Sequence, residues 1–521
     1  MSALVTDQFR IVNANNFVES LLNNNNSYYV FLGLSNPGST GLPVGFGRTT
    51  TWDASPSDIP SPVDNFQYLS HYRDTILFGK KIGSDNVRRV IRRINWTSNT
   101  RYDMYRHDYS VNNLSPNSSR SRLYDTNYYV MNSDFKVYIC IDNGSSGTNL
   151  RGNISRDEPK FVDLEPTAAG SSGDGYIWKY LFTVNPADII KFDTTEYIVL
   201  PNDWETSTDP QIVNVRESGD SFENNNQIKK VYIEKAGKSI YASETYKIVG
   251  DGTGGEVEVI ANNGQITDVK VISGGSGYTW AQIDLMRSSE STSERAKLIP
   301  IIPPSNGHGY DIYTELGSDK ILIYSRFDDS TKDFPVDTKF AQVGILQNPK
   351  KLNSRTENFT ESTFSSLYSL KLDLDSITET DLPQIGEIME QNLSNSKKAR
   401  GYVVSYDTET NVLKYYQDRS LYFDNTFNQT DNDNISIKGE IFSFEASSNE
   451  ITPFGGSVNT SFSGITTTIG SKQINLGVTF QDGLAQPEIN KSTGKIIYID
   501  NRSLIERDSR QKEDVKIILE F

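Results

Sequence analysis

Residues 173–184 read GDGYIWKYLFTV, and this stretch decides the fold class. Large aromatic residues occupy every second position, and a period of two places them on one face of a β-strand. The Gly-Asp-Gly that begins the stretch is a turn signal, because glycine adopts positive φ without steric cost. Four large rings on one face need a wide apolar partner, which is either another sheet or another subunit. The predicted core residues are Tyr176, Trp178, Tyr180 and Phe182.

The composition indicates a folded, acidic chain. At about 150 residues per domain, 521 residues suggest roughly three domains. Hydrophobic residues make up only 36% of the chain, but 11% of all residues are aromatic, which argues against disorder. Asp and Glu (67) outnumber Lys and Arg (51), giving a formal net charge of −16. This charge disfavours nucleic acid and anionic membranes as partners, because binding to either depends on cationic groups.

The residues that carry chemistry are few and scattered. Cys140 is the single cysteine, which excludes an intrachain disulfide, and its apolar surroundings predict a packed core thiol. His71, His107 and His308 lack the spacing of metal ligands. The chain contains no nucleophile elbow and no zinc-protease sequence. We therefore predict no catalytic residues, no metal and no cofactor, and a protein that builds surfaces.

Neither end of the chain indicates targeting to a membrane. The N-terminus lacks the basic and apolar segments of a signal peptide. No window approaches the roughly 18 apolar residues of a transmembrane helix. We expect a soluble protein that is synthesised in a reducing cytoplasm.

Two helices are predicted near the N-terminus. Thr6 or Asp7 caps the first helix, which ends in a run of four asparagines that favour turns. A buried strand follows over 28–34, and a proline-rich loop spans 56–62. The second helix starts near Asp64. The helically spaced apolar residues of the first helix are Phe9, Val12, Phe17, Leu21 and Leu22.

Two β-rich stretches interrupt the chain. Residues 209–308 hold a weak repeat with glycine-rich corners, and residues 361–484 hold short strands with one helix predicted over 381–393. The final strand, 515–521, alternates its apolar residues and is expected to pair inside a sheet. We predict an α+β, mainly β fold with a mixed sheet or sandwich core, few helices and two inserted all-β modules. The predicted segments are a core over 1–208, 309–360 and 485–521, and inserted modules over 209–308 and 361–484.

Three short stretches imitate ligand-binding loops. Residues 237–239 (GKS) resemble the end of a phosphate-binding loop, but Tyr232 stands where that loop needs its first glycine. The glycine-rich stretch 250–255 leads into an alternating strand, so no helix N-terminus is there to meet a phosphate. The stretch 431–434 lacks the glycine and glutamate of a calcium loop. We interpret all three as turns of a β-rich chain.

A cluster of arginines inverts the sign of charge locally within this acidic chain. Salt bridges to the chain's own carboxylates, contact with another protein and contact with nucleic acid are all open interpretations of the cluster. We take it as the candidate interface. Its residues are Arg88, Arg89, Arg92, Arg93 and Arg101.

In addition, several blocks of this sequence, taken in order, resemble the baseplate wedge subunit of contractile-tailed (myovirus) bacteriophages. This subunit is the dimeric protein at the periphery of each wedge. The blocks run from residue 46 to the last residue, and 209–308 and 361–484 look like insertions relative to the compact form of the family. The blocks are Phe46-Gly47-Arg48 with Trp52, Ile91-Arg92-Arg93 with Trp96, Thr100-Arg101-Tyr102, 173–182, 196–201, 342–349, 494–502 and the terminal strand.

The resemblance implies a structural, non-enzymatic protein of the virion tail baseplate. It implies a homodimer that docks to other wedge proteins during assembly of a contractile tail, with neither nucleic acid nor membrane as a partner. The family has no catalytic residues to transfer. The matched Arg92-Arg93 pair is implied to be structural, either as a fixed salt bridge or as an interface contact.

Two other functions remain open. The β-rich insertions could bind a receptor or a glycan, because exposed aromatic residues on β modules often stack on sugars. A tail-associated hydrolase is motivated only by the supply of carboxylates, since glycosidases use a pair of them.

Overall fold

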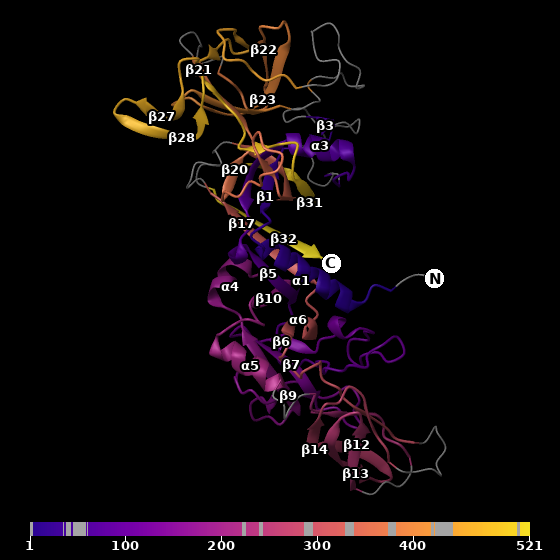
Figure 1. Cartoon of the computed structure of the whole chain (residues 1–521). Coiled ribbons are helices and arrows are strands. Elements are labelled where there is room, and N and C mark those ends of the chain that lie inside the picture. Colours follow the sequence, from indigo (N-terminus) through magenta and orange to yellow (C-terminus); the bar gives the residue numbers. More distant parts are fainter. Residues whose placement is uncertain are drawn as a thin grey trace. The chain divides into compact units, whose positions relative to one another are not determined.

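The computed structural model describes residues 4–34, 36–37, 43–44, 59, 61–220, 226–238, 243–285, 295–328, 338–373, 382–417, 421, 441–507 and 511–521 (Figure 1). The chain divides into two compact units. Unit 1 comprises Met1–Phe17, Arg88–Leu322 and Ile517–Phe521, and unit 2 comprises Val18–Val87 and Ile323–Lys516. Four of the described elements run from one unit into the other, namely α1 (Asp7–Leu22), β5 (Val87–Arg92), β17 (Lys320–Phe327) and β32 (Glu513–Glu520).

Unit 1 holds most of the described helices. They are α4 (Pro186–Phe192), α5 (Pro210–Asp220), α6 (Ile312–Glu315) and the short 3-10 turn η3 (Leu123–Asp125). Its strands are β5 (Val87–Arg92), β6 (Tyr129–Met131), β7 (Lys136–Asn143), β8 (Thr167–Ala168), β9 (Tyr176–Thr183), β10 (Tyr197–Val199), β11 (Val231–Lys235), β12 (Glu244–Gly250), β13 (Thr253–Asn262), β14 (Gln265–Ser276), β15 (Ala281–Ile283) and β16 (Lys297–Pro300). The sheets have the strand orders β6-β7-β9-β8, β10-β5-β17-β32, β14-β13-β12-β15 and β11-β16.

Unit 2 is built mainly from strands, with α3 (Phe66–Asp74) and the 3-10 turn η2 (Ser84–Asn86). The strands are β1 (Tyr28–Gly33), β2 (Asn36–Pro37), β3 (Pro43–Val44), β4 (Ile76–Lys81), β18 (Lys339–Gln347), β19 (Lys350–Lys351), β20 (Thr363–Ser365), β21 (Tyr368–Asp373), β22 (Ile388–Asn392), β23 (Lys398–Asp407), β24 (Val412–Tyr416), β25 (Ile451–Thr452), β26 (Ser457–Val458), β27 (Gly464–Ile469), β28 (Lys472–Phe480), β29 (Leu484–Ala485), β30 (Ile489–Asn490) and β31 (Lys495–Glu506). The larger sheets have the orders β20-β4-β1-β18-β31 and β25-β22-β23-β24-β21-β26, and β27-β28, β19-β30 and β2-β3 form pairs.

The mainly β, α+β class is therefore confirmed. The first predicted helix is confirmed as α1, and the second begins at Phe66 because the Asn65 side chain accepts a hydrogen bond from the Tyr68 N–H at 2.9 Å. The predicted apolar face of α1 is wrong in part, since Phe9 is 57% exposed and Val12 is 49% exposed. The buried stripe follows the 3- and 4-residue spacing of one helix face. Its residues are Ile11, Ala14, Val18 and Leu21.

Two further predictions about local structure are wrong. Residues 209–308 are not all β, because α5 occupies Pro210–Asp220 and begins after Asp209, which accepts a hydrogen bond from the Gln211 N–H. The helix predicted over 381–393 is also absent, since β22 lies at Ile388–Asn392 and pairs with β23. A buried Met389 and a buried Gln391 show the period of two that belongs to a strand. The predicted loop 56–62 lies largely outside the described residues.

The four-stranded sheet of unit 1 at residues 244–283 has a core of its own. Tyr278 lies at its centre, where its hydroxyl accepts a hydrogen bond from Gly255 N at 3.0 Å. The strand pair β11-β16 joins the sheet to the rest of unit 1, because the Arg106 guanidinium lies 3.8 Å from the centre of the Tyr232 ring. The buried residues of this core are Ile228, Val231, Ile233, Ile248, Val257, Val259, Ile266, Val269, Tyr278, Leu298 and Ile302.

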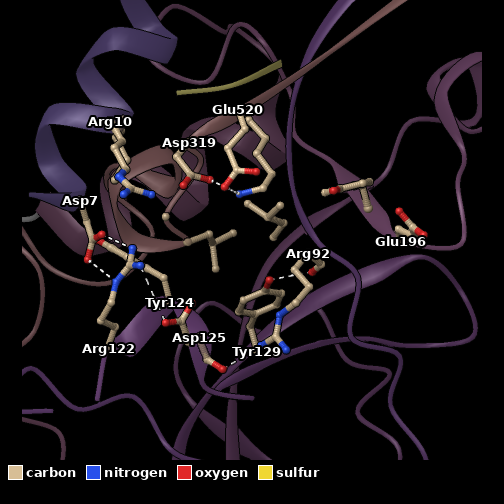
Figure 2. A pocket seen from close by; sticks show the side chains of 16 residues that line it. Asp7, Arg10, Arg92, Arg122, Tyr124, Asp125, Tyr129, Glu196, Asp319 and Glu520 are labelled. Atoms are coloured by element: carbon tan, nitrogen blue, oxygen red, sulfur yellow. Dashed lines mark hydrogen bonds and ion pairs between the residues drawn. The ribbon is translucent and has the colours of Figure 1, made fainter. Parts of the chain in front are cut away.

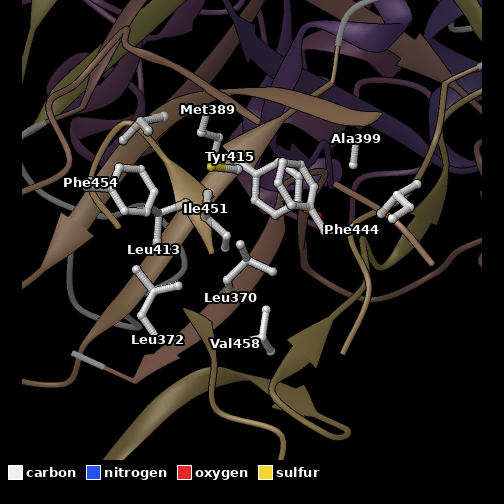
Figure 3. Packing of buried hydrophobic residues seen from close by; sticks show 12 residues of the cluster. Leu370, Leu372, Met389, Ala399, Leu413, Tyr415, Phe444, Ile451, Phe454 and Val458 are labelled. Atoms are coloured by element: carbon white, nitrogen blue, oxygen red, sulfur yellow. The ribbon is translucent and has the colours of Figure 1, made fainter. Parts of the chain in front are cut away.

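Unit 2 has a separate core in its larger sheet. Figure 3 shows Met389, Tyr415 and Phe444 meeting at one side of this cluster, with Leu370 and Leu372 on the other. Tyr415 and Phe444 pack edge to face with ring centres 4.9 Å apart. The sheet therefore does not depend on a core shared with β1 and β18.

The five-stranded sheet of unit 2 requires a glycine at one position. A Cβ on Gly344 of β18 would lie 2.4 Å from the Phe31 ring of β1, so any larger residue would displace that ring. Beside it, the buried Gln342 amide donates a hydrogen bond to Asn501 of β31 at 2.7 Å. These contacts set the register in which β18 pairs with β1 and β31.

We predict that replacing residues 236–296 with an Asn-Gly turn leaves a folded protein. Lys235 and Lys297 are the last paired residues of β11-β16, and a two-residue turn suits such a pair. The measurement is circular dichroism with thermal unfolding, which should show one cooperative loss of β signal for each unit. A longer deletion of 229–301 also removes the Arg106–Tyr232 contact and should unfold at a markedly lower temperature. Insoluble protein from the shorter deletion, with the full chain soluble, would contradict the prediction.

Candidate functional site

Strand β9 is buried on both faces. The four aromatic residues on one face, Tyr176, Trp178, Tyr180 and Phe182, are at most 2% exposed. On the opposite face Leu181 is fully buried, and Lys179 is also buried. The Lys179 ammonium donates hydrogen bonds to Leu164 O at 2.7 Å and to Ser218 Oγ of α5 at 3.2 Å. Burial lowers the pKa of Lys179 because it disfavours the cation, and the two hydrogen bonds partly offset that cost.

The turn before β9 holds the aromatic face in place. Gly173 and Gly175 both have positive φ, at 66° and 84°. Between them, Asp174 accepts hydrogen bonds from the Tyr176 N–H at 3.0 Å and from the Arg156 N–H at 2.8 Å. The Tyr176 hydroxyl then accepts from the Tyr102 N–H at 2.9 Å. One turn therefore positions the strand and the loop that covers it.

The rings of β9 continue into a larger aromatic cluster within unit 1. Trp178 stacks on Tyr176 with ring centres 5.4 Å apart, and the Tyr102 ring meets Trp178 edge on at 5.7 Å. At the other end of the strand, Phe182 meets Trp204 at 6.3 Å. The partner that these rings require is supplied by unit 1 itself.

The arginine cluster makes contacts within unit 1. Arg88 pairs with Asp188 at 2.8 Å, and its guanidinium lies 5.1 Å from the centre of the Phe192 ring. Arg89 is 6% exposed, and its Nε donates to Asn15 Oδ1 at 2.7 Å.

The remaining arginines of the cluster are likewise engaged. Arg92 donates to Thr126 O at 2.9 Å, and Arg93 pairs with Asp193 at 2.6 Å. Arg101 donates to Gly152 O at 3.3 Å. These contacts favour the interpretation in which the arginines bond to groups of their own chain.

A cavity of about 280 Å³ lies in unit 1 beside this cluster (Figure 2). Its walls come from α1, β5, η3, β6, β10, the segment between α6 and β17, and the end of β32, and charged side chains of both signs line it. Arg122 forms a salt bridge with Asp7, and Lys320 pairs with Asp319 at 2.8 Å and with Glu520 at 3.2 Å. The charges largely satisfy one another, so the cavity offers no strong field of one sign to a small ion.

Phenols in and near the cavity stay protonated. Burial, and next the negative charge of Asp7, raises the pKa of Tyr124, whose hydroxyl donates to Thr314 O at 2.7 Å. Burial likewise raises the pKa of Tyr129, which donates to Arg92 O at 2.6 Å. Neither group is available as a base near neutral pH, so their role in this wall is structural.

The other groups that could carry chemistry are also engaged in the fold. His308 Nδ1 lies 2.5 Å from Glu315 Oε1, and the two residues are buried against the Tyr105 ring. His107 Nδ1 accepts from the Ile302 N–H at 3.2 Å. Burial raises the pKa of the Cys140 thiol, as expected of a packed core cysteine. Among the described residues no group of three or more His, Cys, Asp or Glu side chains is arranged to hold a metal ion.

Of the three stretches that imitate ligand-binding loops, the structure describes one in full. Residues 250–255 form the corner between β12 and β13, as predicted for a hairpin. In the 237–239 stretch only the first two residues are described, and 431–434 lie outside the described part of the chain. Within that part, no helix is long and apolar enough to cross a membrane.

Comparison with known proteins gives two matches. The family model described as "Bacteriophage T4, Gp8" matches residues 163–246, which contain β9, α4, β10, α5 and β11. The baseplate wedge protein gp8 of Enterobacteria phage T4 is 28% identical over 234 residues. The chain is thus similar to phage Gp8 proteins over part of its length. The aligned region covers 40% of this chain and 63% of the T4 protein, so the chain spans less than two thirds of the length of that relative.

Several blocks that carried the resemblance to wedge subunits lie side by side in the fold. Ile91 of β5 pairs with Ile198 of β10, which joins the 91–93 block to the 196–201 block. In unit 2, the 342–349 block in β18 pairs with the 494–502 block in β31. The block at 46–48 and Trp52 lie outside the described residues. The blocks that pair are distant in sequence, which explains why no single block reveals the sheet they form.

We predict that Trp178→Ala lowers the free energy of unfolding by about 3–5 kcal/mol, because the ring is fully buried. The indole N–H has no hydrogen-bond partner among the described residues, so its removal relieves one unpaired donor and favours the lower part of this range. Denaturant unfolding followed by fluorescence measures the change. The matched control is Trp280→Ala, which removes a ring that is 53% exposed and should cost less than about 1 kcal/mol. Equal losses for the two variants would show that Trp178 is not a core residue.

Proposed function

We propose that this protein is a structural subunit of the baseplate wedge in a contractile phage tail. The observation that carries the proposal is the Gp8 family match over residues 163–246, together with the identity to the T4 wedge protein. The matched region contains the buried aromatic strand, so the shared feature is a scaffold rather than a reactive site. The protein is then located in the virion, at the tail baseplate.

The finer parts of the proposal are a homodimer that docks to other wedge proteins and has no catalytic role. The absence of catalysis is supported by the engagement of its titratable groups: the described histidines and the single cysteine are buried or bonded within the fold. A net charge of −16 fits docking to positively charged protein surfaces. We also propose that 209–308 and 361–484 are additions to a wedge core formed by 1–208, 309–360 and 485–521. In support, separate hydrophobic cores lie within the two additions.

We predict that the chain is present in purified tails and labels the baseplate. Peptides of the chain should be found by mass spectrometry of tails, and antibody-bound gold should lie at the baseplate end. Light scattering of the purified chain should give twice its mass of 58.5 kDa. Absence of the chain from tails would overturn the wedge assignment. If the chain is present in tails but the purified chain scatters light as a monomer, only the proposal of a homodimer in solution is overturned.

A second candidate function is glycan or receptor binding through the first β module. Trp280 is 53% exposed, which is unusual for so large an apolar ring. Asp251 holds its loop by accepting hydrogen bonds from the N–H groups of Thr279 at 2.9 Å and Trp280 at 3.1 Å. A hydrogen bond from the Thr279 hydroxyl, and next these two N–H groups, lower the pKa of Asp251 to about 2, so the loop keeps the bonds across the physiological range. A rigid, exposed indole is suited to stacking on a sugar ring.

The prediction for this function is specific retention on a glycan array that is lost in Trp280→Ala. The matched control is Trp204→Phe, a change at a fully buried tryptophan that should leave array binding unchanged in protein that folds. No retention of the full chain on the array, or equal retention of the Trp280→Ala variant, would remove this candidate.

A further inference from the structure

In the described part of the chain, the hairpin β27-β28 of unit 2 pairs with no third strand, which leaves the outer edge of β27 open. β27 pairs with β28 and joins no larger sheet. β28 is anchored, because Leu476, Val478 and Phe480 are buried in a small cluster with Val412 and Ala485. In Figure 1 the hairpin extends to one side of the sheet that contains β22 and β23. An isolated two-stranded hairpin is only marginally stable in water, so a third strand would stabilise it.

The open edge carries neither a charge nor a proline, and its one irregularity is the register shift between Gly464 and Thr466 at the start of β27. Natural edge strands carry charges, prolines or bulges that prevent contact with another strand. Residues 451–481 contain a single charged residue, Lys472, where the chain average of 23% would give about seven. The edge itself reads Ile-Thr-Thr-Thr-Ile over residues 465–469, which is uncharged, β-branched throughout and free of proline. A net charge of −16 makes this neutral segment exceptional in the chain.

The register of the hairpin shows which backbone groups of β27 point outward. Ile469 and Lys472 flank the two-residue turn and form its closing pair, so they are hydrogen-bonded to each other. Hydrogen-bonded and non-hydrogen-bonded pairs alternate along an antiparallel ladder. Thr467 therefore bonds inward to β28, whereas the N–H and C=O groups of Thr466 and Thr468 point away from it.

The sequence of this edge is symmetric about Thr467. If two copies of β27 pair antiparallel across a twofold axis at Thr467, Thr466 faces Thr468 of the second copy. Thr467 then faces its own counterpart, and Ile465, which lies at the register shift of β27, comes nearest the second Ile469. Thr466 and Thr468 are the residues whose backbone groups point outward, so the symmetric register is also the one that satisfies them.

We propose that β27 is a self-complementary edge at which two copies of this chain join their hairpins into a four-stranded sheet. The inference rests on the proposed homodimer and gives the position of one of its contacts. Threonine pairs and Ile–Ile pairs across strands are favourable, and a twofold interface requires the same surface on both copies. A five-residue edge buries much less than the roughly 1,200 Å² of a standard stable interface. The contact therefore acts between chains that other contacts already hold together.

The experiment is disulfide trapping of Thr467→Cys in the full chain. Thr467 faces itself in a non-hydrogen-bonded pair, whose Cα separation of about 4.5 Å falls within the range that a disulfide spans. Cys140 is the single native cysteine and is buried, so the new thiol is the one that reacts under mild oxidation. Non-reducing gels of the free chain and of assembled tails should show a crosslinked dimer.

The matched control is Thr466→Cys, which lies on the same strand and is half-buried like Thr467. Its counterpart across the proposed axis is Thr468, so Thr466→Cys alone should crosslink at least about ten times more slowly than Thr467→Cys, because pairing raises the effective thiol concentration only at the axis. A mixture of Thr466→Cys with a mass-tagged Thr468→Cys should restore crosslinking, giving a dimer of intermediate mass.

Equal crosslinking rates for Thr467→Cys and Thr466→Cys, in both the free chain and assembled tails, would overturn the placement at β27. If light scattering shows a dimer but Thr467→Cys does not crosslink, the homodimer stands and its contact lies elsewhere. Circular dichroism of each variant confirms that the comparison is made on folded protein.

Discussion

Burial of β9 on both faces is the constraint on which unit 1 depends. A strand with four aromatic rings on one side and a buried lysine and leucine on the other must be covered twice. One side is covered by the loop that contains Tyr102, whose ring meets Trp178, and α5 contributes to the other through Ser218. These contacts hold a β-strand, a long loop and a helix to one another, so each needs the other two to fold.

Contacts within unit 1 explain how an acidic chain keeps a cluster of arginines. Arg88 pairs with Asp188 in the first turn of α4, Arg93 pairs with Asp193 at the end of that helix, and Arg89 is buried beside Tyr313. Three cations on β5 and its continuation thereby attach a short helix and the middle of α1 to the sheet. Two of these three positive charges are paired with aspartates of the same protomer.

The aromatic strand, the N-terminal helix and the mainly β class were predictable because each repeats at a short period. Alternating rings define a strand, and the spacing of capping and apolar residues defines a helix. The partners of the arginines were not predictable, since Arg88 and Asp188 are far apart in sequence and no local pattern links them. Helix α5 did carry a signal, Asp209 before Pro210, but the neighbouring β-rich segment dominated the interpretation. The burial of Lys179 was hidden because a lysine usually marks the solvent face, and its acceptors come from distant segments.

Assembly of copies that each carry a net charge of −16 must overcome their mutual repulsion. Two kinds of surface reduce that cost, a cationic patch and a neutral one. In the arginine cluster, Arg88 and Arg93 pair with aspartates of unit 1, whereas the exposed Arg92 and Arg101 bond to backbone carbonyls and keep their positive charge at the surface. Residues 451–481, with Lys472 as their single charge, supply the second kind. A backbone edge pairs through N–H and C=O groups, whose contribution does not depend on net charge, so it is the type of contact that two acidic chains can make with least repulsion.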